Sequence, residues 1–191
     1  MLDTSLDGKV AIVTGANNPI GIGAAMAKAL SAQGVKVFLT YKRIAPESAP
    51  TEAPQQAGEA LYNYHRARGA DEIVSQIKAA GGDVVAQEFD LSDPAAVPQL
   101  FDAAEAAYGP VNILINNAAH WEPATFLPDN STLTNSAPTE FFSGEIPTIN
   151  ADLHDRVFAV NTRGSTLMMA EFARRHIARG DDWGRIINLS T

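Results

Sequence analysis

The stretch that decides the fold is residues 9–40, KVAIVTGANNPIGIGAAMAKALSAQGVKVFLT. It opens with a continuous apolar run over residues 9–14, which predicts a strand buried on both faces. Apolar residues then recur at helical spacing over residues 21–33, and Gly34 follows them as a typical C-terminal cap. Residues 35–40 predict a second buried strand. A strand, a helix and a strand in so short a stretch predict one βαβ unit.

The remaining sequence continues this alternation. Further strands are predicted over residues 84–89, 111–115 and 185–189, and further helices from beyond Gly58 to Gly81, from Ser92 or Asp93 to Tyr108, and over residues 150–179. Pro98 predicts that the second of these helices has an irregular or shifted start. Two segments, at about 43–66 and 120–149, interrupt the alternation and are predicted to be surface excursions.

Strands that are continuous apolar runs and that alternate with helices predict a parallel sheet covered on both faces. Right-handed crossovers then give an α/β fold with a doubly wound, Rossmann-type sheet in the strand order 3-2-1-4-5. At this length we expect residues 1–191 to form a single dinucleotide-binding domain.

The composition excludes several classes of function. The chain has 14 basic and 22 acidic residues and a net charge of −8, which disfavours nucleic acid or an anionic membrane surface as a partner. It has no cysteine, so disulfide scaffolds, zinc–thiolate sites and thiol catalysis are excluded. The four histidines show no ligand spacing, so we expect no metal site. No apolar run approaches the roughly 20 residues of a membrane span, and we expect a soluble, cytoplasmic protein.

Three glycines, Gly15, Gly21 and Gly23, lie between the first strand and the first helix. Glycines at this junction let the backbone approach a pyrophosphate, and the helix N-terminus offers free N–H groups. The same glycines would also suit a tight turn with close helix packing, but their place in a βαβ unit favours nucleotide binding. The loop residues expected to share this role are Asn17, Asn18, Ile20 and Ile22.

The end of the second strand predicts which dinucleotide is bound. An acid about 20 residues after the glycines would bind the ribose hydroxyls of NAD, whereas a basic side chain would accept the 2′-phosphate of NADP. The residues there are Tyr41, Lys42 and Arg43, with no acid among them. This position predicts NADP rather than NAD, although two cations at a loop also fit a solvated surface.

Five motifs occur in order along the chain: Thr14-Gly15 with Gly21-Ile22-Gly23, Asp90-Leu91, Asn116-Asn117-Ala118-Ala119, Val160-Asn161 with Gly164, and Ile186 to Thr191. They resemble, in turn, the TGxxxGIG loop, the acid after the third strand, the NNAG segment, the VNxxG helix and the INxSS strand end of the short-chain dehydrogenase/reductase family. The resemblance is to the classical type, and especially to NADP-dependent 3-oxoacyl-carrier-protein reductases.

This resemblance implies an oxidoreductase that transfers a hydride between NADP(H) and a ketone, an aldehyde or a secondary alcohol. It places Asp90 and Leu91 near the adenine, and it adds Asn117, Ala118 and Ala119 to the cofactor site. For catalysis it gives Asn161 a role in the proton relay. It also places Thr191 in the position of the serine that holds the substrate oxygen, with Ser190 as the alternative.

The resemblance also implies a homodimer or homotetramer joined through the long helix. That helix is more apolar than one buried stripe requires, at Val157, Phe158, Leu167, Met168 and Phe172.

The sequence departs from the family pattern in three places. Gly15 and Gly21 are two residues further apart than in the classical loop, which also resembles the divergent enoyl reductases of the same superfamily. Ala119 replaces a glycine. No Tyr-x-x-x-Lys motif occurs, and we expect the chain to end before the helix that carries it. The pairs Tyr62 with Arg66 and Tyr64 with Arg68 are interpreted as solvated helix surface. A non-catalytic dinucleotide-binding protein therefore remains an alternative function.

Overall fold

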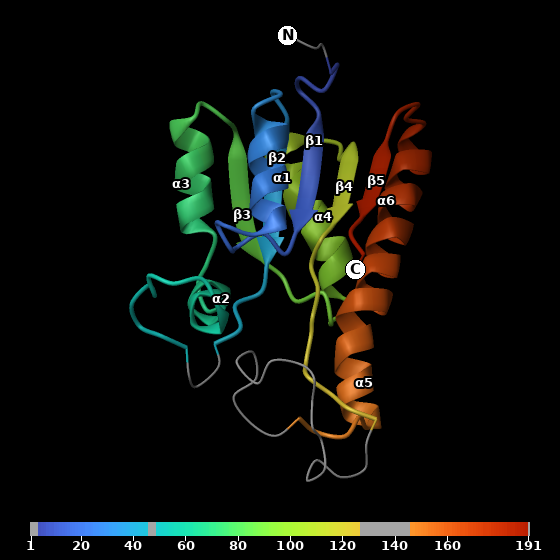
Figure 1. Cartoon of the computed structure of the whole chain (residues 1–191). Coiled ribbons are helices and arrows are strands. Elements are labelled where there is room, and N and C mark those ends of the chain that lie inside the picture. The colour runs from blue at the N-terminus through green and yellow to red at the C-terminus, as the bar shows by residue number, and fades with distance from the viewer. Residues whose placement is uncertain (1–3, 46–48, 127–145, 191) are drawn as a thin grey trace.

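The computed structural model describes residues 4–45, 49–126 and 146–190. Within these residues five parallel strands form one sheet in the order β3-β2-β1-β4-β5 (Figure 1). The strands are β1 (Val10–Thr14), β2 (Lys36–Tyr41), β3 (Val84–Glu88), β4 (Ile113–Asn116) and β5 (Arg185–Asn188). The predicted Rossmann-type sheet and its strand order are confirmed.

Helices cover both faces of the sheet. One face packs against α1 (Ile22–Ser31) and α3 (Asp71–Ala79), and the other against α4 (Ala96–Tyr108) and α6 (Ser165–Arg179). Two short helices, α2 (Glu59–Arg66) and α5 (Ala151–Phe158), lie beyond the carboxyl ends of the strands (Figure 1). No helix among the described residues is long and apolar enough to cross a membrane.

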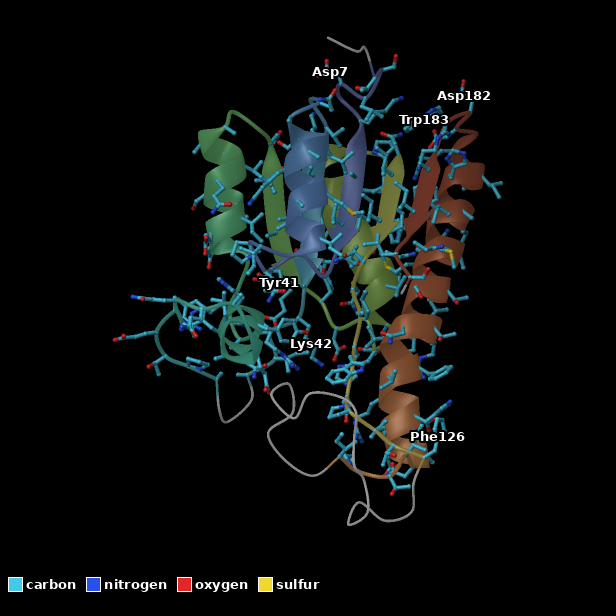
Figure 2. The ribbon with its side chains drawn as sticks, in the orientation of Figure 1. Asp7, Tyr41, Lys42, Phe126, Asp182 and Trp183 are labelled. Carbon is cyan, nitrogen blue, oxygen red and sulfur yellow. The ribbon has the colours of Figure 1, made fainter. Side chains whose placement is uncertain are left out.

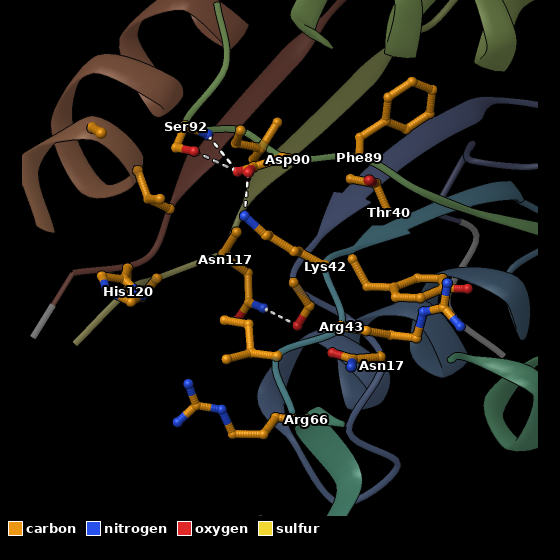
Figure 3. A pocket seen from close by; sticks show the side chains of 18 of the residues that line it. Asn17, Thr40, Lys42, Arg43, Arg66, Phe89, Asp90, Ser92, Asn117 and His120 are labelled. Carbon is orange, nitrogen blue, oxygen red and sulfur yellow. Dashed lines mark hydrogen bonds and ion pairs between the residues drawn. The ribbon is translucent and has the colours of Figure 1, made fainter. Parts of the chain in front are cut away.

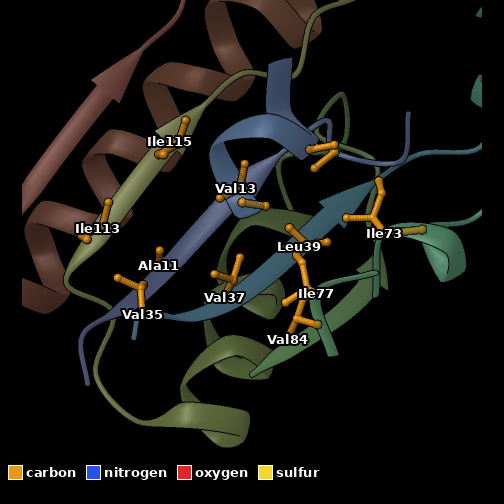
Figure 4. Packing of buried hydrophobic residues seen from close by; sticks show 14 residues of the cluster. Ala11, Val13, Val35, Val37, Leu39, Ile73, Ile77, Val84, Ile113 and Ile115 are labelled. Carbon is orange, nitrogen blue, oxygen red and sulfur yellow. The ribbon is translucent and has the colours of Figure 1, made fainter. Parts of the chain in front are cut away.

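The core explains why the strands are continuous apolar runs. Ala11 and Val13 of β1 point to the face covered by α1 and α3, where they join Val37, Leu39 and Ile77 (Figure 4). The alternate residues of β1 and β2 point to the opposite face, against α4 and α6. Because side chains alternate between two buried faces, nearly every position of an inner strand is apolar. The buried threonines Thr14 and Thr40 lie only toward the carboxyl ends of β1 and β2.

The predicted helix from beyond Gly58 to Gly81 is wrong in one respect, because it is two helices. The chain leaves helical geometry between α2 and α3, over residues 67–70. There the Asn17 side-chain amide donates hydrogen bonds to the carbonyl oxygens of Arg68 at 2.9 Å and His65 at 3.4 Å. Asn17 thus satisfies carbonyl groups at the C-terminal end of α2, which ends the helix against the glycine loop.

The helix predicted over residues 150–179 is present but changes geometry in its middle. A π-helical segment, η3 (Ala159–Gly164), joins α5 to α6. The Ser165 hydroxyl donates to the carbonyl oxygen of Asn161 at 2.6 Å, beside this widened turn. Single π turns inside long helices are frequent at functional sites, and this one contains Asn161.

The helix after β3 begins at Ala96, later than Ser92 or Asp93. Pro98 therefore falls in its first turn, where a missing backbone N–H removes no hydrogen bond of the helix. The Asp93 carboxylate accepts from the backbone N–H of Ala95 at 2.9 Å and orders the turn before it. The shifted start that Pro98 predicted is confirmed.

The carboxyl ends of β1 and β4 are joined by a buried hydroxyl. Thr14 Oγ1 accepts from the backbone N–H groups of Asn117 at 3.0 Å and Ala118 at 2.9 Å, and donates to the carbonyl oxygen of Ile115 at 3.3 Å. Thr40 lies opposite Thr14 in the register of β1 with β2 and is equally buried, at 1% exposure. Its hydroxyl has no hydrogen-bond partner among the described residues.

Thr14 and Thr40 give a matched test of the hydrogen bonds that join the carboxyl ends of β1 and β4. We expect Thr14→Val to lower the free energy of unfolding by about 1–3 kcal/mol, because two backbone N–H groups lose their acceptor. Thr40→Val should change it by less than about 0.5 kcal/mol, because no hydrogen bond is lost. Urea unfolding of both variants measures the difference, and equal losses would contradict the role of Thr14.

Candidate functional site

A cavity of about 900 Å³ lies at the carboxyl ends of the strands (Figure 3). Its wall is made by the segments that follow β1, β2, β3 and β4, together with α2 and the α5–η3 region. In Figure 2, Tyr41 and Lys42 mark this end of the sheet, whereas Asp7 and Trp183 mark the opposite end. In an open parallel sheet this is where ligands bind, beside the strands at which the order reverses.

The glycine loop forms one wall of this cavity, close to the end of β4. Gly15 has a φ of +68°, and a Cβ there would lie 2.6 Å from Ala118 Cα. A Cβ on Gly23 would lie 2.6 Å from the side-chain nitrogen of Asn117. Both positions therefore require glycine, one for its backbone conformation and both for close approach. The two contacts bring the start of α1 against the segment that follows β4.

The N-terminus of α1 has the features of an anion site. Its cap residue, Gly21, provides no side chain, and no side-chain hydrogen bond caps the helix. Asn17, Asn18 and Gly21 line the cavity, as the sequence predicted. Free N–H groups and the positive end of a helix dipole favour a phosphate at such a place. The residues present therefore fit a bound pyrophosphate.

Three loop residues predicted to bind the cofactor do not line the cavity. The side chains of Ile20 and Ile22 are 70% and 63% exposed, and Gly23 is buried behind the loop. The direction of each side chain decides whether a loop residue faces the cavity. The spacing of a sequence motif does not predict that direction.

The cations at the end of β2 line the cavity, but both are paired with acids. Lys42 forms an ion pair with Asp90 (Figure 3). Arg43 donates to Glu88 through its backbone N–H at 2.8 Å and its Nε at 2.7 Å. The parallel register sets Tyr41 opposite Glu88, which brings the acids of β3 beside the residues after β2. Glu88 is not among the predicted site residues, although the predicted strand order sets the end of the third strand beside the end of the second.

These pairs change the protonation of both acids. Burial disfavours the charge on Asp90, but hydrogen bonds from Lys42 and Ser92 outweigh it and lower the pKa of the carboxyl. The backbone N–H of Arg43 is the largest influence on Glu88 and lowers its pKa, with the Arg43 side chain adding to the effect. Both carboxylates are therefore charged at neutral pH, and each neutralises a neighbouring cation.

The interpretation of Arg66 as solvated helix surface is wrong. Arg66 lines the cavity, and its Nε is buried with no hydrogen-bond partner among the described residues. Arg68 does lie away from the cavity lining, stacked 3.5 Å from the ring centroid of Tyr64. The contact of Asn17 with the end of α2 turns this helix toward the glycine loop, and helical spacing alone gives no sign of that contact.

The segment after β4 closes the other side of the cavity. The side-chain amide of Asn117 donates to the carbonyl oxygens of Thr14 at 2.8 Å and Gly15 at 3.0 Å. Asn117, Ala118, Ala119 and His120 line the cavity, as do Asp90 and Leu91 after β3. The cofactor-site residues that the family resemblance implied after β3 and after β4 therefore face one space.

Asn161 holds this segment rather than lining the cavity. Its Oδ1 accepts from the backbone N–H of His120 at 2.7 Å, and its Nδ2 donates to the carbonyl oxygen of the same residue at 2.8 Å. Ser190 is exposed after β5 and is not part of the cavity lining, and Thr191 lies outside the described residues. Among the described residues no group of three or more histidine or acidic side chains forms a metal site.

A second contact ties the same segment to α5. The Glu122 carboxylate accepts from Arg156 at 2.8 and 2.7 Å and lies 2.7 Å from His120 Nε2. The hydrogen bonds from Arg156 are the largest influence on Glu122 and outweigh its partial burial. With His120 adding to the effect, they lower its pKa to about 2.

Comparison with known proteins places this geometry in a family. Residues 55–191 match the family described as short chain dehydrogenase. Versicolorin reductase 1 of Aspergillus parasiticus is 34% identical over 186 residues, which are 97% of this chain and 53% of that protein. The chloroplastic NADPH-dependent aldehyde reductase 2 of Arabidopsis thaliana is 33% identical over 189 residues, covering 97% of this chain and 56% of that protein.

A solved structure agrees with this assignment. A metagenomic short-chain oxidoreductase in complex with NADP has a TM-score of 0.66 and 28% identity, over 98% of this chain and 64% of that one. The chain spans about half the length of the curated relatives that it matches. With its Rossmann-type sheet and its match over most of its length, this chain belongs to the short-chain dehydrogenase/reductase family of oxidoreductases.

Proposed function

We propose that the protein binds NADP(H) in the cavity and transfers a hydride between this cofactor and a ketone, an aldehyde or a secondary alcohol. The observation that carries the proposal is the uncapped N-terminus of α1, which faces a cavity where strand order reverses. A relative named as an NADPH-dependent aldehyde reductase and a similar structure solved with NADP support this choice of cofactor and substrate class.

In this proposal each part of the wall holds one part of the cofactor. Gly15, Asn17, Asn18 and Gly21, with the free N–H groups of α1, take the pyrophosphate. Asp90 and Leu91 take the adenine side, and Tyr41, Lys42 and Arg43 border the adenosine ribose. Ala118 and Ala119 border the nicotinamide. Ile20, Ile22 and Gly23 act by shaping the loop, because they do not line the cavity.

The bound nicotinamide supplies or accepts the hydride, and the chain's own residues orient the reactants. Asn161 acts as a positioning residue in this proposal, because its side chain fixes the backbone of His120 at the cavity wall. Ser190 and Thr191 are proposed to hold the substrate oxygen. The Tyr-x-x-x-Lys motif is not among the 191 residues, so the acid of the whole protein is not assigned to any of them.

We also propose that the protein is a homodimer or homotetramer joined through the α5–α6 helix pair. Met168 and Phe172 are buried in the core of the chain, whereas Phe158 and Ile177 are large, apolar and exposed. Exposed apolar side chains on one long helix favour an interface with a second copy, most simply a two-fold one.

The cofactor assignment predicts tighter binding of NADPH than of NADH. A charge-assisted contact to the 2′-phosphate should make the difference about 10- to 100-fold in dissociation constant. Calorimetric titration of the protein with each dinucleotide measures it, and hydrogen exchange should show added protection over residues 15–23 when NADPH is bound. Equal affinities would overturn the choice of NADP, and binding of neither dinucleotide would overturn the proposed function.

The contact between Glu122 and Arg156 predicts a specific pH dependence. Because the pKa of Glu122 is lowered from 4.5 to about 2, its stabilising effect is complete above pH 4.5 and is lost as the pH falls toward 2. The parent should therefore be more stable than Glu122→Gln at pH 5, with a difference that shrinks as the pH falls below 4.5 toward 2.

Urea unfolding at several pH values measures this difference. Arg156→Met serves as the matched variant, because it removes the main partner and should reduce the pH-dependent part of the effect of Glu122, leaving the contribution of His120. A difference between parent and Glu122→Gln that stays constant down to the lowest pH would show that the carboxylate charge is irrelevant.

A further inference from the structure

The last turn of α2 is fixed between two parts of the cavity wall. The Asn17 amide from the glycine loop donates to the carbonyl oxygen of Arg68 at 2.9 Å. The backbone N–H of Ile44, which follows β2, donates to the carbonyl oxygen of Arg66 at 2.8 Å. These bonds join an excursion of the chain to both segments that border the adenosine end of the cavity. The position of the Arg66 backbone is therefore set by hydrogen bonds to the carbonyl oxygens of Arg66 and Arg68.

The Arg66 side chain is partly buried, and one of its donors, Nε, is fully buried without an acceptor among the described residues. This side chain lines the cavity (Figure 3). Its Cζ lies 5.3 Å from the ring centroid of Tyr62, which orients the side chain but accepts no conventional hydrogen bond. A buried donor without an acceptor is unfavourable, so this geometry points to an anionic ligand.

Most other cations of the cavity wall are already paired with acids. The lining residues include five cations, Lys42, Arg43, Arg66, Arg156 and Arg163. Lys42 pairs with Asp90, Arg43 with Glu88 and Arg156 with Glu122. Arg163 donates to the backbone carbonyl of Ser92, on the side of the cavity formed by η3. At the end of β2, Arg66 is thus the cation with no carboxylate partner in the described part of the chain.

A phosphomonoester at this end needs such a cation. Asp90 and Glu88 repel a phosphate dianion and already occupy Lys42 and Arg43, so these two residues add little net positive charge. The guanidinium fork of an arginine can bind two phosphate oxygens at once. Arg66 lies next to Ile44 and the glycine loop, where the adenosine ribose of a dinucleotide would be held.

We propose that Arg66, on the excursion between β2 and α3, binds the 2′-phosphate of NADP(H) and sets the preference for NADP(H) over NAD(H). This inference rests on the proposed function, since it names a residue for the same cofactor site. It assigns the main phosphate contact to Arg66 rather than to the cations directly after β2.

The test compares two arginines of the same excursion. Arg66→Met keeps the length of the side chain and removes the charge and the fork. Arg68→Met is the matched control, because Arg68 does not line the cavity but anchors the excursion through the carbonyl oxygens of Tyr64 and Thr51, each at 2.8 Å. Arg66→Lys keeps the charge without the fork. Calorimetry with NADPH, NADH, adenosine 2′,5′-bisphosphate and 5′-AMP measures binding without any turnover.

We expect Arg66→Met to weaken binding of NADPH and of adenosine 2′,5′-bisphosphate by about 10- to 100-fold, and to leave NADH and 5′-AMP within about twofold. Arg66→Lys should fall between Arg66→Met and the parent, and Arg68→Met should match the parent. Circular dichroism of each variant confirms that it folds.

Three results would overturn the inference while the proposed function stands. These are unchanged NADPH binding in Arg66→Met, an equal loss for all four ligands, and the same loss in Arg68→Met, which would show that the order of the excursion matters rather than the Arg66 charge. A parent that binds neither dinucleotide would overturn the proposed function itself, so the two failures are distinguishable.

Discussion

The cavity depends on the bonded junction between the carboxyl ends of β1 and β4. Four hydrogen bonds form this junction. The Thr14 hydroxyl accepts from the backbone N–H groups of Asn117 and Ala118, and the Asn117 side-chain amide donates to the carbonyl oxygens of Thr14 and Gly15. Gly15 then passes so close to Ala118 that no larger residue fits. Because the junction fixes where both segments start, it sets the place of the glycine loop, of α1 and of the wall after β4. Every candidate binding residue is positioned relative to it.

Electrostatic pairing sets which parts of the wall can attract an anion. The chain has a net charge of −8, yet the described residues that line the cavity include five cations and two carboxylates, Asp90 and Asp155. Three of these cations are paired with acids, which offset their positive charge. The attraction for phosphate therefore comes mainly from the helix N-terminus and from the cations without acidic partners.

The wall after β4 is held from one side by the long helix. Asn161 lies in its π-helical segment and bonds both backbone groups of His120, while Arg156 of α5 bonds Glu122. A regular α-helix would rotate the residues after residue 159 differently, so the widened turn helps to aim Asn161 at this backbone. The geometry of the helix and the shape of the cavity are thus linked through two side chains.

The sequence by itself determined the strands, their order and the glycine loop, because burial on both faces and close backbone approach restrict which residues are allowed. It also identified 12 of the 25 described residues that line the cavity, mainly those that follow β1, β2, β3 and β4. It did not reveal the pairing of Arg43 with Glu88 or the exposure of Ile20 and Ile22. Nor did it reveal that α2 ends where the Asn17 side chain binds the carbonyl oxygen of Arg68. These features depend on contacts between segments far apart in the chain. Only the tertiary structure decided that Arg66 faces the cavity. The helix that carries Arg66 is oriented by hydrogen bonds from Asn17 and Ile44, and the spacing of apolar residues within the helix does not predict these contacts.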